Sequence, residues 1–195
     1  MTLVVAVEGL PGCGKTTAIE HMIRDLSTEG LRVAAVDIDT APHASGLRSF
    51  AHTLPLKHLE RSVIFWAMRI MQYDAIQEMR DRMDVIFADR SWGSVLAFDG
   101  YGNGISLPAL ENIGGDLTQP DITLLFSAPL EIAAARKESR TMQDLAFARR
   151  VEQGYAALAA AHAWMLVDAT RTPENVKEQC LALIHAALAK RELSP

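Results

Sequence analysis

The chain opens on LVVAVEGLPGCGKTTAI, residues 3–19, and the rest of the architecture follows from this stretch. Its first part, residues 3–7, is a β-branched apolar run that predicts a buried strand. The next segment, GLPGCGKT, fits the phosphate-binding pattern G-x-x-x-x-G-K-[ST], and a helix is expected to begin at Lys15. Glycines let the backbone form a nest of N–H groups that surrounds phosphate, and the new helix adds its positive end. The segment therefore predicts a bound nucleoside triphosphate.

The individual residues of this loop have expected roles in holding ATP and Mg²⁺. Lys15 would neutralise the β- and γ-phosphates, and the Thr16 hydroxyl would complete the Mg²⁺ shell. Cys13 is expected to be a small neutral filler rather than a reactive thiol. The expected nucleotide-binding residues of this segment are Gly9, Pro11, Gly12, Cys13, Gly14, Lys15, Thr16 and Thr17.

Bulk composition restricts the possible partners. The 195 residues are 49% apolar and 22% charged, as in an ordinary globular protein, and their number suits one domain, residues 1–195. A net charge of -5 gives no electrostatic footprint for a nucleic-acid polymer, although small phosphorylated partners remain open. No segment reaches the apolar length of a membrane helix, so we expect a cytoplasmic protein without a membrane partner.

Strand-like and helical segments alternate along the chain. Continuously apolar runs recur at four further places, 33–36, 85–88, 122–126 and 165–167, and each is followed by helical periodicity. Such alternation implies crossover connections and buried parallel strands. We therefore expect an α/β fold, a doubly wound five-stranded parallel sheet with helices on both faces. A long helical stretch, at about 56–83, exceeds a minimal crossover and indicates a second substrate site.

An acidic and a basic residue follow the third strand-like run. Asp89 stands where a second Mg²⁺-directing carboxylate is needed, and the planar guanidinium of Arg90 suits an acceptor phosphate. A capping Asp beside a surface Arg is the alternative reading.

These residues are part of a resemblance to the thymidylate kinases that covers nearly the whole length of the chain. The matching motifs are DRSWGSVLAFDG at 89–100, PDITLLF at 120–126, and LVDATR at 166–171. The resemblance implies the P-loop kinase fold, ATP with Mg²⁺, a homodimer, and an adenine-contacting loop that includes Ala169 and Arg171. It also implies that Phe65 stacks on the acceptor base and that Arg69 binds its edge. The alternative is that Phe65 belongs to the core and Arg69 pairs with a surface acid.

The chain also departs from the family pattern. Phe98 matches an aromatic residue whose hydroxyl helps to exclude a ribose 2′-OH, but Phe98 has no hydroxyl. Asp37 is the nearest match to an acid after the second strand, where the family's neighbouring Arg is missing. The lid is short, at about 136–145, and because no Arg lies in the phosphate loop, Arg136 and Arg140 are expected to supply catalytic cations. They would share one face if the helix continued.

Three functions remain open at this stage. A phosphate acceptor needs no strong base, and Arg90 and Arg48 favour a nucleoside monophosphate. A hydroxyl acceptor, such as a nucleoside or another small metabolite, would need a carboxylate base, which Asp37 or Asp39 could provide. A nucleotide-dependent switch without phosphotransfer is the third. The first, an ATP-dependent nucleotide kinase, is favoured.

Overall fold

A computed structural model describes residues 2–41, 44, 46–53, 58–114, 117 and 119–192, without the side chains of residues 58, 140 and 192. Its centre is one parallel sheet of five strands in the order β2-β3-β1-β4-β5. The strands are β1 (Leu3–Gly9), β2 (Val33–Val36), β3 (Val85–Asp89), β4 (Ile122–Ser127) and β5 (Met165–Asp168). The predicted fold class is confirmed, and each predicted strand is present, with β2 at the predicted bounds.

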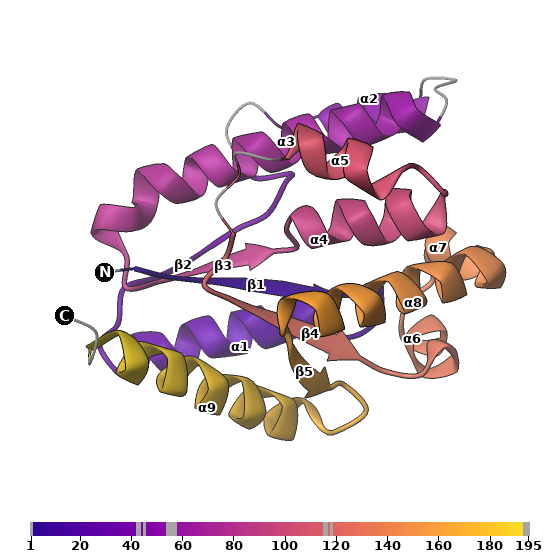
Figure 1. Cartoon of the computed structure of the whole chain (residues 1–195). Helices are drawn as coiled ribbons and strands as arrows, with labels where there is room; N and C mark the ends of the chain where they lie inside the picture. The colour runs from indigo at the N-terminus through magenta and orange to yellow at the C-terminus, as the bar shows by residue number, and fades with distance from the viewer. Residues whose placement is uncertain are drawn as a thin grey trace.

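Helices cover both faces of the sheet (Figure 1). Helices α1 and α9 lie on one side, whereas α3, α4 and α5 lie on the other. Their bounds are α1 (Lys15–Thr28), α2 (Leu47–Thr53), α3 (His58–Met79), α4 (Trp92–Val95), α5 (Leu107–Ile113), α6 (Leu130–Arg136), α7 (Arg140–Gln143), α8 (Leu145–His162) and α9 (Pro173–Glu192). A 3-10 turn, η1 (Arg80–Arg82), follows α3, and a π-helix, η2 (Leu96–Gly102), follows α4.

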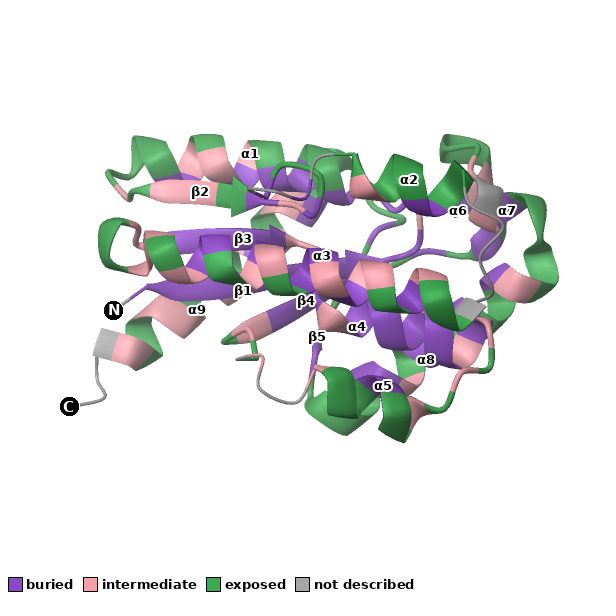
Figure 2. Ribbon diagram, turned by 90° about the horizontal axis from the view of Figure 1, so that it is seen from above, coloured by how far each residue is buried: buried purple, intermediate pink, exposed green. Residues whose placement is uncertain are grey.

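Alternate residues of the central strands pack into separate apolar clusters, as the two-residue period of a strand requires. Val5 and Phe87 pack in the cluster that holds Met22 of α1 and Cys180 of α9. Val4, Ala6, Ile86 and Ala88 pack with Ala75 and Ile76 of α3. The central strands are therefore buried along their length, whereas the covering helices expose their outer sides (Figure 2).

The long helical stretch consists of a helix and a 3-10 turn. The predicted range 56–83 becomes α3, which ends at Met79, and residues 54–57 lie outside the described residues. After Met79 the chain tightens into η1 and then extends at Met83 to enter β3. The expected helical stretch is therefore present as α3 followed by η1, after which the chain turns towards the sheet.

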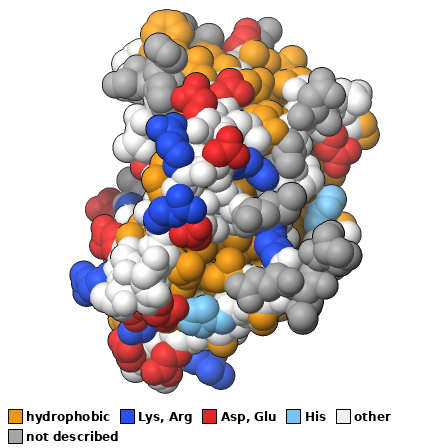
Figure 3. Space-filling view, turned by 90° about the vertical axis from the view of Figure 1, so that its left-hand side faces the viewer, with side chains coloured by type: hydrophobic (Ala, Val, Ile, Leu, Met, Phe, Trp, Pro, Cys, Tyr) orange, Lys and Arg blue, Asp and Glu red, His pale blue; other side chains and the backbone are white. Residues whose placement is uncertain are grey.

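Charged side chains of both signs occur on one end of the molecule. On the face at the amino ends of the strands, acidic and basic side chains are interspersed (Figure 3). Among the described residues, no helix combines the length and apolarity that crossing a bilayer requires.

Candidate active site

The phosphate loop joins β1 to α1, as predicted, at the carboxyl end of the central strand. Gly12 has φ 85°, and a Cβ atom there would overlap the carbonyl oxygen of Ala133 in α6. Gly14 caps α1 in the left-handed region, at φ 81°. Both positions need glycine for this backbone path, which leaves main-chain amides to meet phosphate oxygens. Pro11 is half-buried beside them, and Thr17 is exposed on the first turn of α1.

Lys15 is buried at the base of the loop. Its ammonium donates a hydrogen bond to the carbonyl oxygen of Leu10 over 2.8 Å. Burial, together with the smaller effect of the neighbouring Arg90, lowers the pKa of Lys15 to about 7. Cys13 is also buried, and burial raises its thiol pKa, which fits the expected neutral filler. Anionic phosphate would restore the charged form of Lys15, so this side chain fits a polyphosphate ligand.

Two oxygen ligands suited to Mg²⁺ lie side by side. The register of β1 against β3 pairs Val7 with Asp89, which brings Asp89 to the phosphate loop. The hydroxyl of Thr16 donates to Asp89 Oδ2 over 3.4 Å. Mg²⁺ usually takes one or two protein oxygens and completes its shell with water and substrate phosphates, so this pair fits the ion. Among the described residues, no cluster of three or more His, Cys, Asp or Glu side chains offers a denser metal site.

Arg90 is held tightly beside the phosphate loop. It has φ 67°, a left-handed conformation that costs a non-glycine residue about 1 kcal/mol. The guanidinium donates to Gly9 O over 3.0 Å, to Tyr155 Oη over 3.1 Å and to Ser94 Oγ over 3.3 Å. Its carbon also lies 5.6 Å from the ring centre of Phe98. The surrounding contacts thus hold a cation at the junction of the loop, β3 and α8.

Sequence reasoning missed the buried carboxylate that completes this arrangement. Glu8 is fully buried at the end of β1. It accepts hydrogen bonds from the backbone and hydroxyl of both Ser91 and Ser94, and from Tyr155. Burial raises the pKa of the Tyr155 hydroxyl, and the neighbouring Glu8 raises it further, so the hydroxyl stays a neutral donor. A lone acid in an apolar strand was the available signal, since a buried carboxylate needs partners.

Phe65 and Arg69 take up a third side of the site, from α3. Phe65 is half-buried and lies outside the main apolar clusters, with its ring 6.1 Å from that of His52. Arg69 is buried and donates from Nη1 to Gln72 Oε1 over 2.7 Å and to Asp89 O over 3.4 Å. The two alternative readings, a core Phe65 and an Arg69 paired with a surface acid, do not describe this arrangement. Phe65 lies outside the apolar clusters, and Arg69 points at the end of β3.

The residues after β2 engage one another. Asp37 accepts hydrogen bonds from the backbone of Asp39 and Thr40 over 2.6 and 2.8 Å, which makes it the stabilising residue of its own turn. Arg48 pairs with Asp39 over 3.0 Å, and both side chains are about half exposed. Arg48 was expected to favour a phosphate acceptor, but here its charge is paired with Asp39, one of the two candidate general bases.

The two lid arginines do not share a helix face. Helix α6 ends at Arg136, and the chain is extended at Lys137 and Ser139 before α7 begins. Ser139 caps α7 by accepting from the Met142 amide, which explains why the first helix cannot run on. The continuous helix on which a shared face depended is therefore absent, and the side chain of Arg140 lies outside the described residues.

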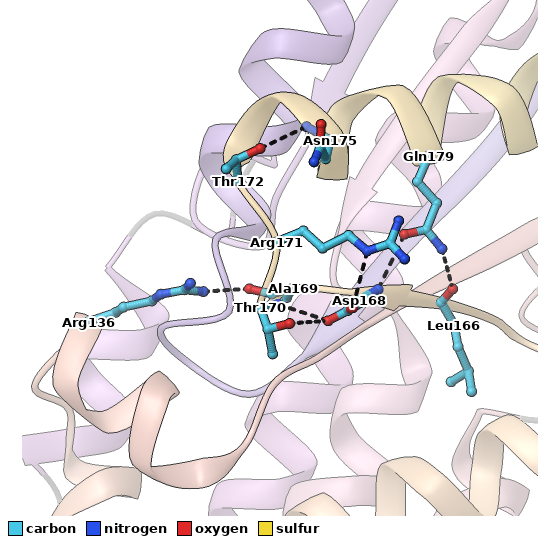
Figure 4. A network of polar contacts seen from close by, with 9 residues as sticks. All are labelled: Arg136, Leu166, Asp168, Ala169, Thr170, Arg171, Thr172, Asn175 and Gln179. Carbon is cyan, nitrogen blue, oxygen red and sulfur yellow. Dashed lines mark hydrogen bonds and ion pairs between the residues drawn. The ribbon is translucent and has the colours of Figure 1, made fainter.

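Arg136 instead reaches the loop after β5 (Figure 4). It donates to the carbonyl oxygen of Ala169 over 2.6 Å. In the same loop Arg171 pairs with Asp168 over 3.2 Å, and Asp168 also accepts from Thr170. The base of the lid is thereby joined to the predicted adenine-contacting loop at Ala169 and Arg171.

Known proteins are similar to this chain in sequence. A sequence model described as thymidylate kinase matches residues 7–180. A thymidylate kinase of Synechococcus sp. strain RCC307 is 30% identical, and the alignment covers 94% of this chain and 96% of the relative. Another, of Synechococcus sp. strain CC9605, is 32% identical over 89% and 92%. The thymidylate kinase of Desulfovibrio desulfuricans is 29% identical over 97% and 98%.

Proposed function

Since this chain belongs to the thymidylate kinase family, we propose that the nucleoside monophosphate which it phosphorylates is thymidylate. The family establishes ATP-dependent phosphotransfer to a nucleoside monophosphate, and it does not favour a hydroxyl acceptor or a non-catalytic switch. Thymidylate as the particular acceptor is the further step. It is supported by Arg69, which reaches the carboxyl end of β3, and by Phe65, which lies four residues earlier on the same helix.

Arg90 carries the assignment of a phosphate acceptor. Its guanidinium lies 3.0 Å from the carbonyl oxygen of Gly9, so it sits where donor and acceptor phosphates would meet. A phosphate monoester has a second pKa of about 6 and is already largely deprotonated at neutral pH. The acceptor oxygen can therefore attack the γ-phosphorus directly, and ADP leaves as the bond to its β-phosphate oxygen breaks.

The remaining residues of the site have proposed roles in that transfer. We infer that Lys15 and the loop amides bind the ATP phosphates, and that Thr16 and Asp89 hold Mg²⁺ and its water ligands. When bound, Mg²⁺ neutralises the charge that develops on the phosphates. Arg136 is proposed to act at the adenine side of the site, because it is bound to Ala169 O, with Arg171 on the same loop. Arg140 remains the proposed lid cation.

The wider organisation is proposed on similar grounds. We infer that residues 1–195 form one kinase domain with a lid at about 136–145, since a single sheet holds the described strands and the chain extends at Lys137 and Ser139. A cytoplasmic location is inferred from the need for ATP and a nucleotide acceptor. A homodimer is inferred from an exposed apolar stripe on α3, formed by Leu59, Val63 and Ile70, with Phe50 on α2 beside it.

A coupled assay of ADP release over a panel of acceptors tests the acceptor. The panel holds dTMP, dUMP, UMP, dCMP, dGMP and thymidine. We expect the highest kcat/KM for dTMP and no turnover of thymidine. Lys15→Ala is the inactive control, because it should abolish transfer to every acceptor while its far-UV circular dichroism spectrum stays like that of the wild type. Preference for a purine nucleotide, or turnover of thymidine, would refute the proposal.

Phe98 gives the same panel a test of sugar selection. Without a ring hydroxyl, Phe98 offers no polar group to a ribose, so we expect UMP to be used within about tenfold of dUMP, a ratio worth about 1.4 kcal/mol. Phe98→Tyr should increase the preference for dUMP. If the ratio of kcat/KM values is unchanged in this variant, Phe98 does not face the sugar.

A further inference from the structure

The side chain of Gln72 joins α3 to the carboxyl ends of two strands, and it is only 2% exposed. Its Nε2 atom donates a hydrogen bond to Val36 O, at the end of β2, over 2.7 Å. The same nitrogen donates to Arg90 O, directly after β3, over 3.2 Å. The carbonyl oxygen of Asp89 lies at 3.4 Å, beyond the usual range of a strong bond. One side-chain nitrogen therefore contacts the backbone at the point where both strands end.

The amide oxygen of Gln72 has a partner of the opposite kind. Its Oε1 atom accepts a hydrogen bond from Arg69 Nη1 over 2.7 Å. Because a guanidinium only donates and a carbonyl oxygen only accepts, the amide cannot turn over without losing its bonds on both sides. Its two N–H groups match the two closer carbonyl oxygens, so each polar atom of the amide has a partner. Glutamate has the same shape but would keep the acceptor and lose both donors.

The bond to Arg90 O acts on a residue in an unfavourable conformation. Arg90 has φ 67°, and its N–H donates to Val7 O over 3.0 Å. The N–H is thus bonded to β1, and the carbonyl oxygen is bonded to α3 through Gln72. The contacts of the guanidinium hold the far end of this side chain, and the two backbone bonds hold its start. Loss of Gln72 would free one of the two, which lets the left-handed backbone relax and move the guanidinium.

The bond to Arg69 acts on the other arginine of the site. Arg69 Nη1 also meets Asp89 O, but over 3.4 Å, so the bond to Gln72 is the closer contact. Burial lowers the pKa of Arg69 to about 10, which leaves this side chain charged at neutral pH. A hydrogen bond from a charged donor is stronger than one between neutral groups. Gln72 therefore determines where this guanidinium lies.

We propose that Gln72 is a positioning residue that holds Arg69 and Arg90 at a fixed separation for one nucleoside monophosphate. The inference rests on the proposed function, in which Arg69 binds the edge of the base and Arg90 binds the phosphate. These two groups stand at opposite ends of the acceptor, so both contacts form together only when the two guanidiniums keep the matching distance. Gln72 acts through the two arginines and not on the substrate.

Steady-state kinetics of Gln72→Met tests this role, because methionine fills a similar volume and has neither the donors nor the acceptor. We expect the KM for dTMP to rise about 10-fold, the KM for ATP to stay within about twofold of the wild type, and kcat to change less than the acceptor KM. Gln77→Met is the matched control. It makes the same change further along α3, where Gln77 Nε2 has no hydrogen-bond partner among the described residues, and it should leave both KM values unchanged. A lower Tm with an unchanged acceptor KM in Gln72→Met would show a structural role only and overturn the proposal.

A second variant, Gln72→Glu, separates the two contacts. Its carboxylate can still accept from Arg69 but cannot donate to Arg90 O. Thymine offers a carbonyl oxygen to a guanidinium, whereas cytosine offers an amino group there, so the ratio of kcat/KM for dTMP over dCMP reports on Arg69. In Gln72→Glu we expect the KM of both nucleotides to rise while this ratio is kept, and in Gln72→Met we expect the ratio to fall. A wild-type ratio in Gln72→Met, or a wild-type KM in Gln72→Glu, would overturn the coupling of the two arginines.

The wild-type protein distinguishes a failure of this inference from a failure of the proposed function. If the wild type prefers another nucleoside monophosphate, thymidylate is refuted as the acceptor. The comparison of Gln72→Met with Gln77→Met is then made with that nucleotide. A rise of its KM in Gln72→Met alone would still support Gln72 as a positioning residue, and equal KM values in the two variants would refute it.

Discussion

At the scale of single residues, the buried ammonium of Lys15 makes nucleotide binding dependent on pH. Burial lowers the pKa of Lys15 to about 7, so about half of the side chains are neutral at that pH. Bound phosphate favours the charged form, so ATP binding should take up a proton. The uptake should approach one proton at higher pH and vanish at about two units below the pKa. Between about pH 7 and 10 the Lys15 side chain binds more protons in the unfolded state than in the native one, so its own contribution to stability should rise with pH there.

Calorimetry of ATP binding in buffers with different ionisation enthalpies measures this uptake. At pH 8, where ATP itself is almost fully deprotonated, the slope of the apparent enthalpy gives the protons that the complex gains. Lys15→Arg is the control, because guanidinium stays charged and should show little uptake. An unchanged slope in Lys15→Arg would assign the proton to another group.

The hydroxyl of Tyr155 is predicted to position Arg90. It accepts from Arg90 Nη1, contacts Ser94 Oγ and donates to Glu8 Oε2. Tyr155→Phe removes these contacts with little change in shape, so we expect the acceptor KM to rise about 3–10-fold, the equivalent of one hydrogen bond of about 1 kcal/mol, with a smaller effect on kcat.

A second tyrosine on an adjoining element gives the control for that variant. Tyr101→Phe makes the same chemical change where the ring packs against Gly154 of α8, and the acceptor KM should stay near that of the wild type. A drop in Tm with an unchanged acceptor KM in Tyr155→Phe would show that the hydroxyl acts only on stability.

At the scale of elements, the phosphate loop depends on its fit against α6. A Cβ at Gly12 would overlap the backbone of Ala133, and its φ of 85° is unfavourable for other residues. We therefore expect Gly12→Ala to weaken ATP binding by more than about 100-fold, since the loop must move from its amide nest. Equilibrium binding of a fluorescent ATP analogue measures this loss.

A control variant at Gly30 separates the effect of backbone strain from the effect of contact between the loop and α6. It has φ 91°, but a Cβ there meets nothing within 4 Å. Gly30→Ala should therefore cost about 1 kcal/mol of unfolding free energy and leave ATP affinity unchanged. Equal losses of affinity in Gly12→Ala and Gly30→Ala would mean that strain alone, and not contact with α6, explains the effect.

The elements differ in how far their sequences determine them. The strands follow from apolar runs such as Val33–Val36, because burial on both faces leaves a continuous pattern. The π-helix Leu96–Gly102 has no such signal, since it is supported by distant contacts such as Ser62 to Asp99 over 2.7 Å. The short lid was expected between Arg136 and about residue 145, but the short helix α7 within it was not, because its cap at Ser139 depends on local backbone geometry.

The residues of the site also differ in how far the sequence alone predicts their positions. Motif spacing brought Thr16, Asp89 and Arg90 together, because strand ends in a parallel sheet meet at one edge. Glu8 and Tyr155 are 147 residues apart in the chain, so no local pattern could have joined them. Long-range polar networks of this kind depend on the packing of whole helices, in this case α8 along η2 and α4.

At the scale of the whole molecule, the outer face of α3 indicates a partner surface. Leu59, Val63 and Ile70 recur at the spacing of one helix face and are 54%, 49% and 38% exposed, and Phe50 of the adjoining α2 is 51% exposed. Exposed apolar side chains gathered on one helix face mark an interface more often than scattered ones do. A two-fold pairing of α3 with its copy would bury the stripe on both subunits at once.

Val63→Glu should therefore disrupt the proposed dimer, which sedimentation velocity at micromolar concentration would show as a shift to the monomer. The carboxylate would be desolvated at the centre of the stripe without a partner, which costs several kcal/mol per subunit and exceeds the stability of a modest interface. Ile132→Glu is the control. Ile132 lies on α6 and is 36% exposed, so the substitution adds the same charge away from α3 and should leave the proposed dimer intact. A monomeric wild type would remove the dimer, and a dimeric Val63→Glu would move its interface away from α3. Because Phe65 lies two residues further along the same helix, the monomer should also show a higher acceptor KM, which links assembly to the acceptor site.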